Sequence, residues 1–218
     1  MAGHPMPKPL LRALLRPWIR REVYECLTLD RQSACRLGLP APAAPSGTQI
    51  RAIERTELDR LSAVPQYSIS RRFLVGIAAR ADRGFGAFVD GELASYAFFA
   101  PQSPTAIDES LRFEFAAGWT YVYKCFTLPR WRGQRLLPLV LASAMAELTD
   151  SGARSTRGFV TLVVRGNQAS RKSLERCGFE PRLDFPVWRV LSRPCHIGAG
   201  EERRNGPFLI DVASAQLS

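Results

Sequence analysis

The stretch Thr127–Met145 reads TLPRWRGQRLLPLVLASAM: an apolar strand ends at a proline, three arginines and a glycine follow, and an apolar helix begins. The N-terminus of a helix has free backbone N–H groups and a partial positive charge, so it can hold an anion such as phosphate. Arg130, Arg132 and Arg135 gather at this end, where cations disfavour a helix unless an anion joins them. Gly133 permits a close backbone approach or a positive φ. We therefore expect a phosphate site here; the alternative is a solvated turn.

Strand and helix patterns alternate on both sides of this junction. The expected strands cover residues 21–29, 48–54, 85–100, 113–128, 158–164 and 184–191. The expected helices cover residues 54–64, 68–80, the end of the opening stretch to about 149, and 167–177. Asp90-Gly91 marks a hairpin turn, and Gly118 marks a break in the longest strand region. The order β-α-α-β-β-β-α-β-α-β predicts an α/β (α+β) fold, in which a mixed sheet carries helices on its faces.

A Pro/Ala-rich linker at Leu37–Gly47 is the clearest boundary in the chain. We expect residues 1–47 to form a basic N-terminal arm with a short strand and this linker. Residues 48–192 should form the main domain, and residues 193–218 a flexible tail. Within the arm, Pro9–Arg21 has a basic amphipathic pattern broken by Pro17. This pattern fits either an arm that packs on the domain or a helix on a membrane surface.

The composition is that of a globular chain, with 46% hydrophobic and 23% charged residues among 218. No apolar run approaches the ~20 residues of a membrane-spanning helix. The five cysteines are scattered, which favours reduced thiols in a cytoplasm and predicts no metal site. A net charge of +10 predicts an anionic partner: a phosphate-bearing cofactor, nucleic acid, a membrane surface or an acidic protein.

Two stretches in order, TLPRWRGQRLLPLVL and NQASRKSLERCGF, resemble the acetyl-CoA-binding core of the GNAT superfamily of N-acyltransferases. In that family a strand leads through a proline, an aromatic residue and Arg-Gly into a pyrophosphate-binding turn. The next strand ends near an asparagine, and a helix closed by Gly-Phe follows. The matching positions are Pro129, Trp131, Arg132, Gly133, Asn167, Ser170, Gly178 and Phe179. The resemblance covers about residues 48–191 and implies a largely antiparallel mixed sheet, a central splayed parallel strand pair and helices on both faces.

The resemblance implies acetyl-CoA as co-substrate, no metal, and direct attack of an amine on the thioester. Pantetheine would lie between the strands Tyr121–Leu128 and Val160–Val164, where it would bond to the backbone near Phe126 and Leu128. The residues implied for cofactor binding are Phe126, Thr127, Leu128, Arg130, Arg132, Gly133, Gln134, Arg135, Leu136, Leu137, Asn167, Ser170 and Ser173.

The sequence departs from the family pattern at three positions. Arg135 and Leu137 replace the second glycine and the Gly/Ala of the turn. Leu174 stands seven residues after Asn167, where many members have a tyrosine that protonates the departing thiolate. Asn167 would hold a water or the cofactor's amide near the thioester, and an N-cap role fits it equally well.

The base that takes the ammonium proton is not identified by any motif. Glu114 is one candidate, as are Asp108 and Glu109 in the preceding loop, although each could be a solvated carboxylate. Tyr123 could relay a proton or simply pack on the sheet. Cys125 has no histidine partner nearby in the sequence, so we interpret it as a buried thiol.

The function predicted from these patterns is transfer of an acetyl group from acetyl-CoA to a primary amine on a small molecule or a sugar. Arg71 and Arg72 hint at an acidic or phosphorylated acceptor. Two alternatives stay open: an acyl carrier protein as donor, which the positive charge would suit, and a non-catalytic binding module. Nucleic acid is disfavoured, because RWRGQR is already explained by the cofactor. We expect a cytoplasmic protein, with contact to the inner face of the membrane as a variant of this prediction.

Overall fold

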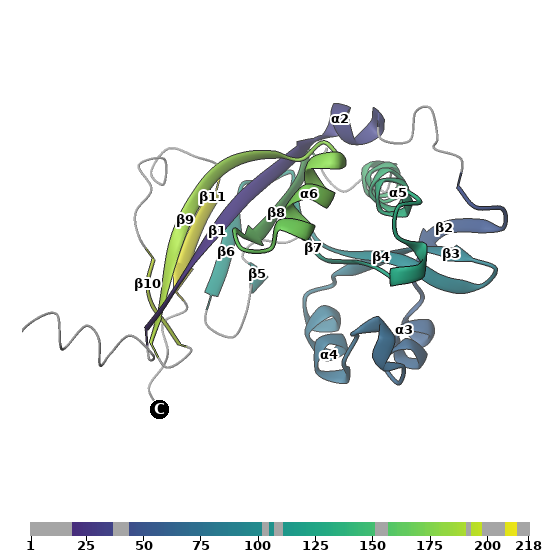
Figure 1. Ribbon diagram of the computed structural model, residues 1–218, viewed down its shortest axis with the longest axis horizontal. Coiled ribbons are helices and arrows are strands. Elements are labelled where there is room, and N and C mark those ends of the chain that lie inside the picture. The colour runs from purple at the N-terminus through teal and green to yellow at the C-terminus, as the bar shows by residue number, and fades with distance from the viewer. Residues whose placement is uncertain are drawn as a thin grey trace, which may run out of the picture.

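The computed structural model describes residues 19–36, 44–101, 105–106, 111–150, 157–190, 193–197 and 208–212 (Figure 1). A mixed eight-stranded sheet has the order β10-β9-β1-β8-β7-β4-β3-β2, and a small sheet has the order β11-β6-β5. The strands of the large sheet are β1 (Ile19–Asp30), β2 (Thr48–Ala52), β3 (Arg83–Val89), β4 (Glu92–Ala100), β7 (Trp119–Thr127), β8 (Gly158–Val164), β9 (Glu180–Val190) and β10 (Arg193–Ile197). Those of the small sheet are β5 (Thr105–Ala106), β6 (Leu111–Phe115) and β11 (Phe208–Val212).

Helices cover both faces of the large sheet, as expected (Figure 1). The α-helices are α2 (Arg31–Arg36), α3 (Arg55–Leu61), α4 (Arg71–Ala79), α5 (Leu136–Asp150) and α6 (Gln168–Arg176), and short 3₁₀ turns cover Pro65–Tyr67 and Pro129–Trp131. The helices α5 and α6 lie on one face, while α3 and α4 lie on the other. Helix α3 begins under a capping box formed by Glu54 and Glu57.

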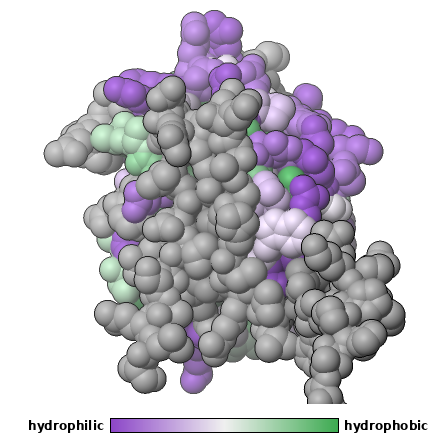
Figure 2. All heavy atoms as spheres, turned by 90° about the vertical axis from the view of Figure 1, so that its left-hand side faces the viewer, coloured by the Kyte–Doolittle hydropathy of each residue, from purple (hydrophilic) through white to green (hydrophobic). Residues whose placement is uncertain are grey.

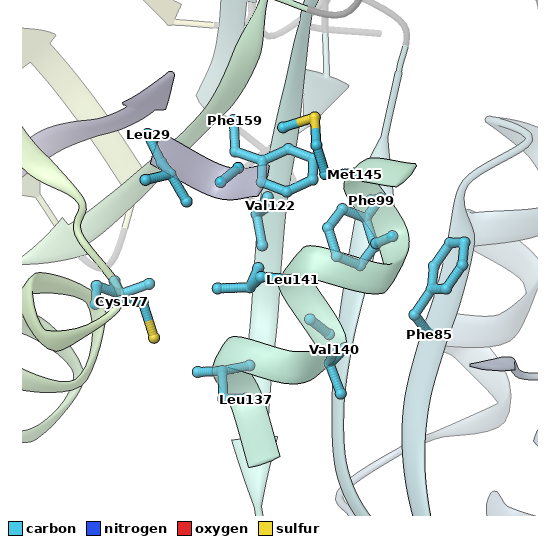
Figure 3. Close-up of a cluster of buried hydrophobic side chains, with 14 of the residues drawn as sticks. Leu29, Phe85, Phe99, Val122, Leu137, Val140, Leu141, Met145, Phe159 and Cys177 are labelled. Carbon is cyan, nitrogen blue, oxygen red and sulfur yellow. The ribbon is translucent and has the colours of Figure 1, made fainter. Parts of the chain in front are cut away.

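The main core lies between α5, α6 and the sheet. Val140, Leu141 and Met145 of α5 face the sheet residues Phe99 and Phe159 (Figure 3). All five are fully buried, so this contact removes a large apolar area from water and fixes α5 on the sheet. The N-terminus of α5 is thereby held at the end of β7.

Two predicted turns are confirmed by their backbone angles. Asp90 and Gly91 have φ values of 50° and 83°, the double positive φ that a tight two-residue hairpin needs. Gly118, at φ 87°, separates β6 from β7, where a break was expected.

The predicted splay of the central strands is also present. Strands β7 and β8 pair in parallel at Trp119↔Gly158, Thr120↔Phe159 and Tyr121↔Val160, and no later pair follows. Strand β7 pairs with β4 along Ser95–Ala100 instead, and two of its residues, Lys124 and Cys125, stand opposite the single Ala97. Lys124 has φ 51°, as expected for an extra residue in a bulge. The bulge bends β7 where it leaves β8.

The expected division into arm, domain and tail differs from the structure in two places. Residues 21–29, assigned to the arm, belong to β1, which pairs with β8 and β9 inside the large sheet. Residues 193–218, expected to be flexible, include β10 on β9 and β11 on β6. Burial explains the first difference, because Cys26, Leu27 and Leu29 are shielded on the two faces of the sheet. Residues 1–18 and 37–43 lie outside the described residues.

Figure 2, seen from the side of β9 and β10, shows hydrophilic side chains gathered along the upper edge. Among the described residues, no helix is long and apolar enough to cross a membrane.

Candidate active site

A cavity of about 650 Å³ opens where β7 and β8 separate. Strand residues of β7 and β8 form its walls, and α4 and α6 close it from opposite faces of the sheet (Figure 1). The lining residues include Phe73 and Arg80 near α4, Tyr121, Tyr123, Lys124 and Cys125 of β7, Thr161 and Val163 of β8, and Ser170 and Leu174 of α6. A ligand can therefore reach this cavity through the sheet at the splay.

Tyr123 is held in the cavity wall by a buried ionic network. Its hydroxyl donates to Asp82 Oδ2 at 2.5 Å and accepts from Arg80 Nη2 at 3.1 Å. Arg80 Nε also donates to Asp82 Oδ2, at 2.8 Å. The Asp82 side chain is only 1% exposed, so the carboxylate lies behind Tyr123 rather than in the cavity. Burial, together with the hydrogen bond and charge of Asp82, raises the pKa of Tyr123.

This network fixes the direction in which Tyr123 can bond. Its proton is committed to Asp82, and one of its two oxygen lone pairs is taken by Arg80. The remaining lone pair can accept an N–H or O–H from a molecule in the cavity. Because its pKa is raised, the phenol keeps its proton at neutral pH. Tyr123 can therefore take up a proton only as it passes its own to Asp82.

Aromatic packing fixes the ring that carries this hydroxyl. The rings of Tyr121 and Tyr123 stack at 5.5 Å with an interplanar angle of 4°. Phe73 of α4 meets Tyr123 edge-on at 6.1 Å. Residues of β7 and α4 thus hold the tyrosine from two sides, which limits its motion in the cavity.

The turn after β7 contains two residues with positive φ, Gly133 and Arg135. The 3₁₀ turn Pro129–Trp131 ends at Arg132, and α5 begins at Leu136. Gly133 has φ 81° and would meet no atom within 4 Å of an added Cβ, so its φ rather than crowding calls for glycine. Arg135 has φ 55°, in the left-handed region that favours glycine. The arginine at the family's glycine position thus keeps the conformation that glycine would have.

The arginines of this turn do not all point at a common ligand. Arg130 is ion-paired with Glu92 at the start of β4, so it is already engaged inside the protein. Arg132 is exposed and donates through Nε to the carbonyl of Thr127 at 3.3 Å. Arg135 is exposed. Arg132 and Arg135 are therefore better placed than Arg130 to receive an anion.

Leu136 and Leu137 were expected to contact the cofactor, but their side chains are buried. Leu137 belongs to the core between α5 and the sheet (Figure 3). The replacement of Gly/Ala by leucine at this position therefore fills the core. Only the backbone of these residues, in the first turn of α5, can face a ligand.

The backbone groups of Phe126 and Leu128, which were expected to bond to pantetheine, bond to β4 instead. Leu128 N–H donates to Ala94 O at 2.9 Å, and Phe126 O accepts from Ser95 Oγ at 3.1 Å. Both residues thus turn their backbone groups toward β4. Backbone groups alternate in direction along a strand, so those of Thr127 point away from β4, and the Thr127 carbonyl accepts from Arg132 Nε. The bulge at Lys124 is the physical reason, since one extra residue reverses the alternation that the sequence suggests.

Of the residues predicted at α6 for cofactor binding, one caps the helix and another lines the cavity. Asn167 caps the helix, because its side chain accepts from Ser170 N–H at 3.1 Å. Ser170 and Leu174 line the cavity, whereas Ser173 does not. Leu174 is buried, and its side chain has no proton to give to a leaving group.

Glu114 is not brought to the cavity. It lies in β6 of the small sheet, opposite Leu209, and is absent from the described lining. Asp108 and Glu109 lie outside the described residues. Cys125 was expected to be buried; it is partly exposed and lines the cavity, but its surroundings raise the pKa of its thiol to about 12, so the thiol stays protonated at neutral pH.

Arg80 and Asp82 are the site residues that sequence reasoning missed. They flank Ala81, which has φ 55° and lies just after the C-terminus of α4. Nothing in the pattern ARADRGF distinguishes them from solvated charges at a helix end. Their role depends on Tyr123, which is distant in sequence and is brought to them by the pairing of β3, β4 and β7.

The fold was compared with those of known proteins. No known family model matches the sequence, and no curated protein matches it either. A functionally unknown conserved protein from Staphylococcus epidermidis superposes with a TM-score of 0.55 at 11% identity, over 87% of this chain and 69% of that one. A GCN5-related N-acetyltransferase-like protein from Streptococcus suis gives 0.52 at 13% identity, over 84% and 66%.

A tandem GNAT protein from the clavulanic acid biosynthesis pathway gives 0.51 at 20% identity, over 86% of this chain and 59% of that one. The chain thus spans between 59% and 69% of the lengths of these three structures. Two of them are described as GNAT or GNAT-like proteins, and the mixed sheet of this chain, with its parallel central pair, matches the GNAT fold. The chain therefore has the GNAT fold that the two sequence stretches predicted.

Proposed function

We propose that this protein is an N-acyltransferase that moves an acetyl group from acetyl-CoA to a primary amine. The observation that carries the proposal is the cavity in the splay between β7 and β8. Strand β7 continues from this cavity to the glycine-containing turn that precedes α5. A thioester in the cavity and a diphosphate at the turn would suit the two ends of acetyl-CoA.

The residues around the turn fit a diphosphate. Gly133 and Arg135 both have positive φ, so their peptide N–H groups can form a concave anion site with the first amides of α5. Arg132 and Arg135 add charge from the solvent side. Toward the thioester, the backbone N–H of Thr127 is directed away from β4 and can bond to the pantetheine. A backbone N–H near the bulge could stabilise the oxyanion, a contribution of ~3 kcal/mol.

Tyr123 and Asp82 supply a path for the ammonium proton. The acceptor's ammonium donates to the free lone pair of Tyr123, which takes the proton as its own moves to Asp82 Oδ2. The neutral amine attacks the thioester carbonyl, a C–N bond forms, and the C–S bond then breaks with its electron pair on sulfur. The second amine proton reaches the thiolate through water, since Leu174 offers none. The products are the amide and CoA, with one proton released.

The test is amine-dependent formation of CoA and acetylated product, followed by chromatography with mass detection. Tyr123→Phe keeps the ring and its stacking but removes the hydroxyl. We expect this variant to bind acetyl-CoA with the affinity of the wild-type protein and to lose about 100-fold in kcat. Asp82→Asn should lower kcat similarly, because the amide cannot accept the proton.

Two results would count against this proposal. Turnover of Tyr123→Phe within about twofold of the original would remove Tyr123 from the proton path. Absence of amine-dependent CoA release across amino acids, polyamines and amino sugars, in a chain that binds acetyl-CoA, would favour the non-catalytic alternative.

A further inference from the structure

The lining of the cavity is cationic. Among its described residues Arg72, Arg80 and Lys124 carry positive charge, and none carries negative charge. Arg80 is balanced by Asp82 behind the wall. Lys124, on the β7 bulge, adds further positive charge to the wall of the cavity. A cavity that received only a cationic amine would repel it.

Lys124 is the most informative of these groups. It is half-buried, and its Nζ lies 4.8 Å from the centroid of the Phe73 ring. Within the part of the chain that the structure describes, no carboxylate forms an ion pair with it. Burial lowers the pKa of its ammonium. A half-buried lysine that has no carboxylate partner among the described residues is costly unless a ligand supplies an anion.

The position of this charge indicates which substrate carries the anion. The turn around Gly133 lies at α5, on the opposite face of the sheet from α4 (Figure 1). A thioester that enters from the α5 side would meet the second substrate on the side of α4. Arg72 and Phe73 belong to α4, and Lys124 contacts Phe73. The cations therefore line the side of the cavity left for the acceptor.

We infer that the acceptor is a primary amine that also carries an anionic group, a carboxylate or a phosphate, which Lys124 binds. The inference rests on the proposed function and narrows its substrate class. The amine of such a molecule would lie at Tyr123, and its anion would lie toward Lys124. Both residues are in β7, and both line the same cavity.

The experiment compares amines that differ only in the anion, with the CoA site filled. Calorimetry in saturating CoA would use alanine against alaninamide, and glucosamine 6-phosphate against glucosamine. The variants are Lys124→Met and a matched control, Lys172→Met, which removes the same charge from an exposed position of α6 that does not line the cavity. The two pairs of amines distinguish a carboxylate from a phosphate.

We expect at least one anionic amine to bind about tenfold or more tightly than its neutral partner. That preference should disappear in Lys124→Met and persist in Lys172→Met. Equal binding within both pairs, or a preference that survives in Lys124→Met, would overturn the inference. Tighter binding of succinyl-CoA than of butyryl-CoA, lost in Lys124→Met, would also overturn it by placing the anion on the acyl group. If CoA itself does not bind, the proposed function fails first, so the two failures are distinguishable.

Discussion

Arg135→Gly should stabilise the fold, although glycine usually destabilises. Arg135 has φ 55°, where the Cβ of an L-residue costs about 1–2 kcal/mol. Glycine removes that cost but adds about 0.5–1 kcal/mol of backbone entropy to the unfolded chain. The net expectation is a gain of ~0.5–1 kcal/mol relative to Arg135→Ala, which keeps the Cβ and loses the same guanidinium. Urea unfolding of the two variants measures this difference directly.

Arg132 provides the matched control for this prediction. It is also exposed and lies three residues earlier, but its φ is −67°, an ordinary value. There the order should reverse, with Arg132→Gly less stable than Arg132→Ala by ~0.5–1 kcal/mol. The same sign at both positions would refute the argument that Arg135 keeps the conformation of a glycine.

Three further outcomes follow from the structure. Gly158→Ala should destabilise by more than ~2 kcal/mol in urea unfolding, because a Cβ would lie 2.3 Å from Leu29 O; Gly166→Ala, with open space around it, should stay within ~0.5 kcal/mol. Asn167→Ala should lose about 1 kcal/mol of stability because it removes the N-cap, whereas Asn167→Asp keeps a capping oxygen and should not. Equal losses in the two variants would contradict the capping role. Stability should also fall between about pH 9 and 12, because Cys26, Cys125 and Cys177 keep their protons to a pKa of about 12 when folded but ionise near 9.0 when unfolded. The slope, up to ~1.4 kcal/mol per pH unit per thiol, should shrink in a chain with all three changed to alanine.

Local patterns predicted much of the fold because each of them depends only on residues that are close together in the sequence. Asp90-Gly91 is a turn wherever two apolar strands flank it, and Asn167 caps a helix with its own side chain. The family resemblance implied a splay between β7 and β8, and the pairing of these two strands confirms it. Pairing between distant strands was not predictable in the same way. Strand β1 joins β8 and β9, more than a hundred residues later, and no local pattern near residues 21–29 indicates this.

The candidate site was predicted in outline but not in its contacts. The turn at Gly133 was identified from charge and glycine, whereas the direction of the side chains was not. Leu137 faces the core because it lies on the buried side of α5. The backbone of Phe126 is directed toward β4 because the bulge at Lys124 shifts the alternation of β7. Asp82 could not be identified from the sequence, since its partner Tyr123 is brought to it only by the folded sheet.

The central claim is that the turn around Gly133 binds the diphosphate of a CoA thioester, and calorimetry with acetyl-CoA tests it most directly. Gly133→Asn and Gly133→Asp are matched in size, and both residues tolerate positive φ, so they differ mainly in charge. We predict micromolar binding by the original chain, with a loss at least about tenfold greater for Gly133→Asp than for Gly133→Asn. Equal losses in the two variants, or no saturable binding by the original chain at millimolar acetyl-CoA, would contradict the account.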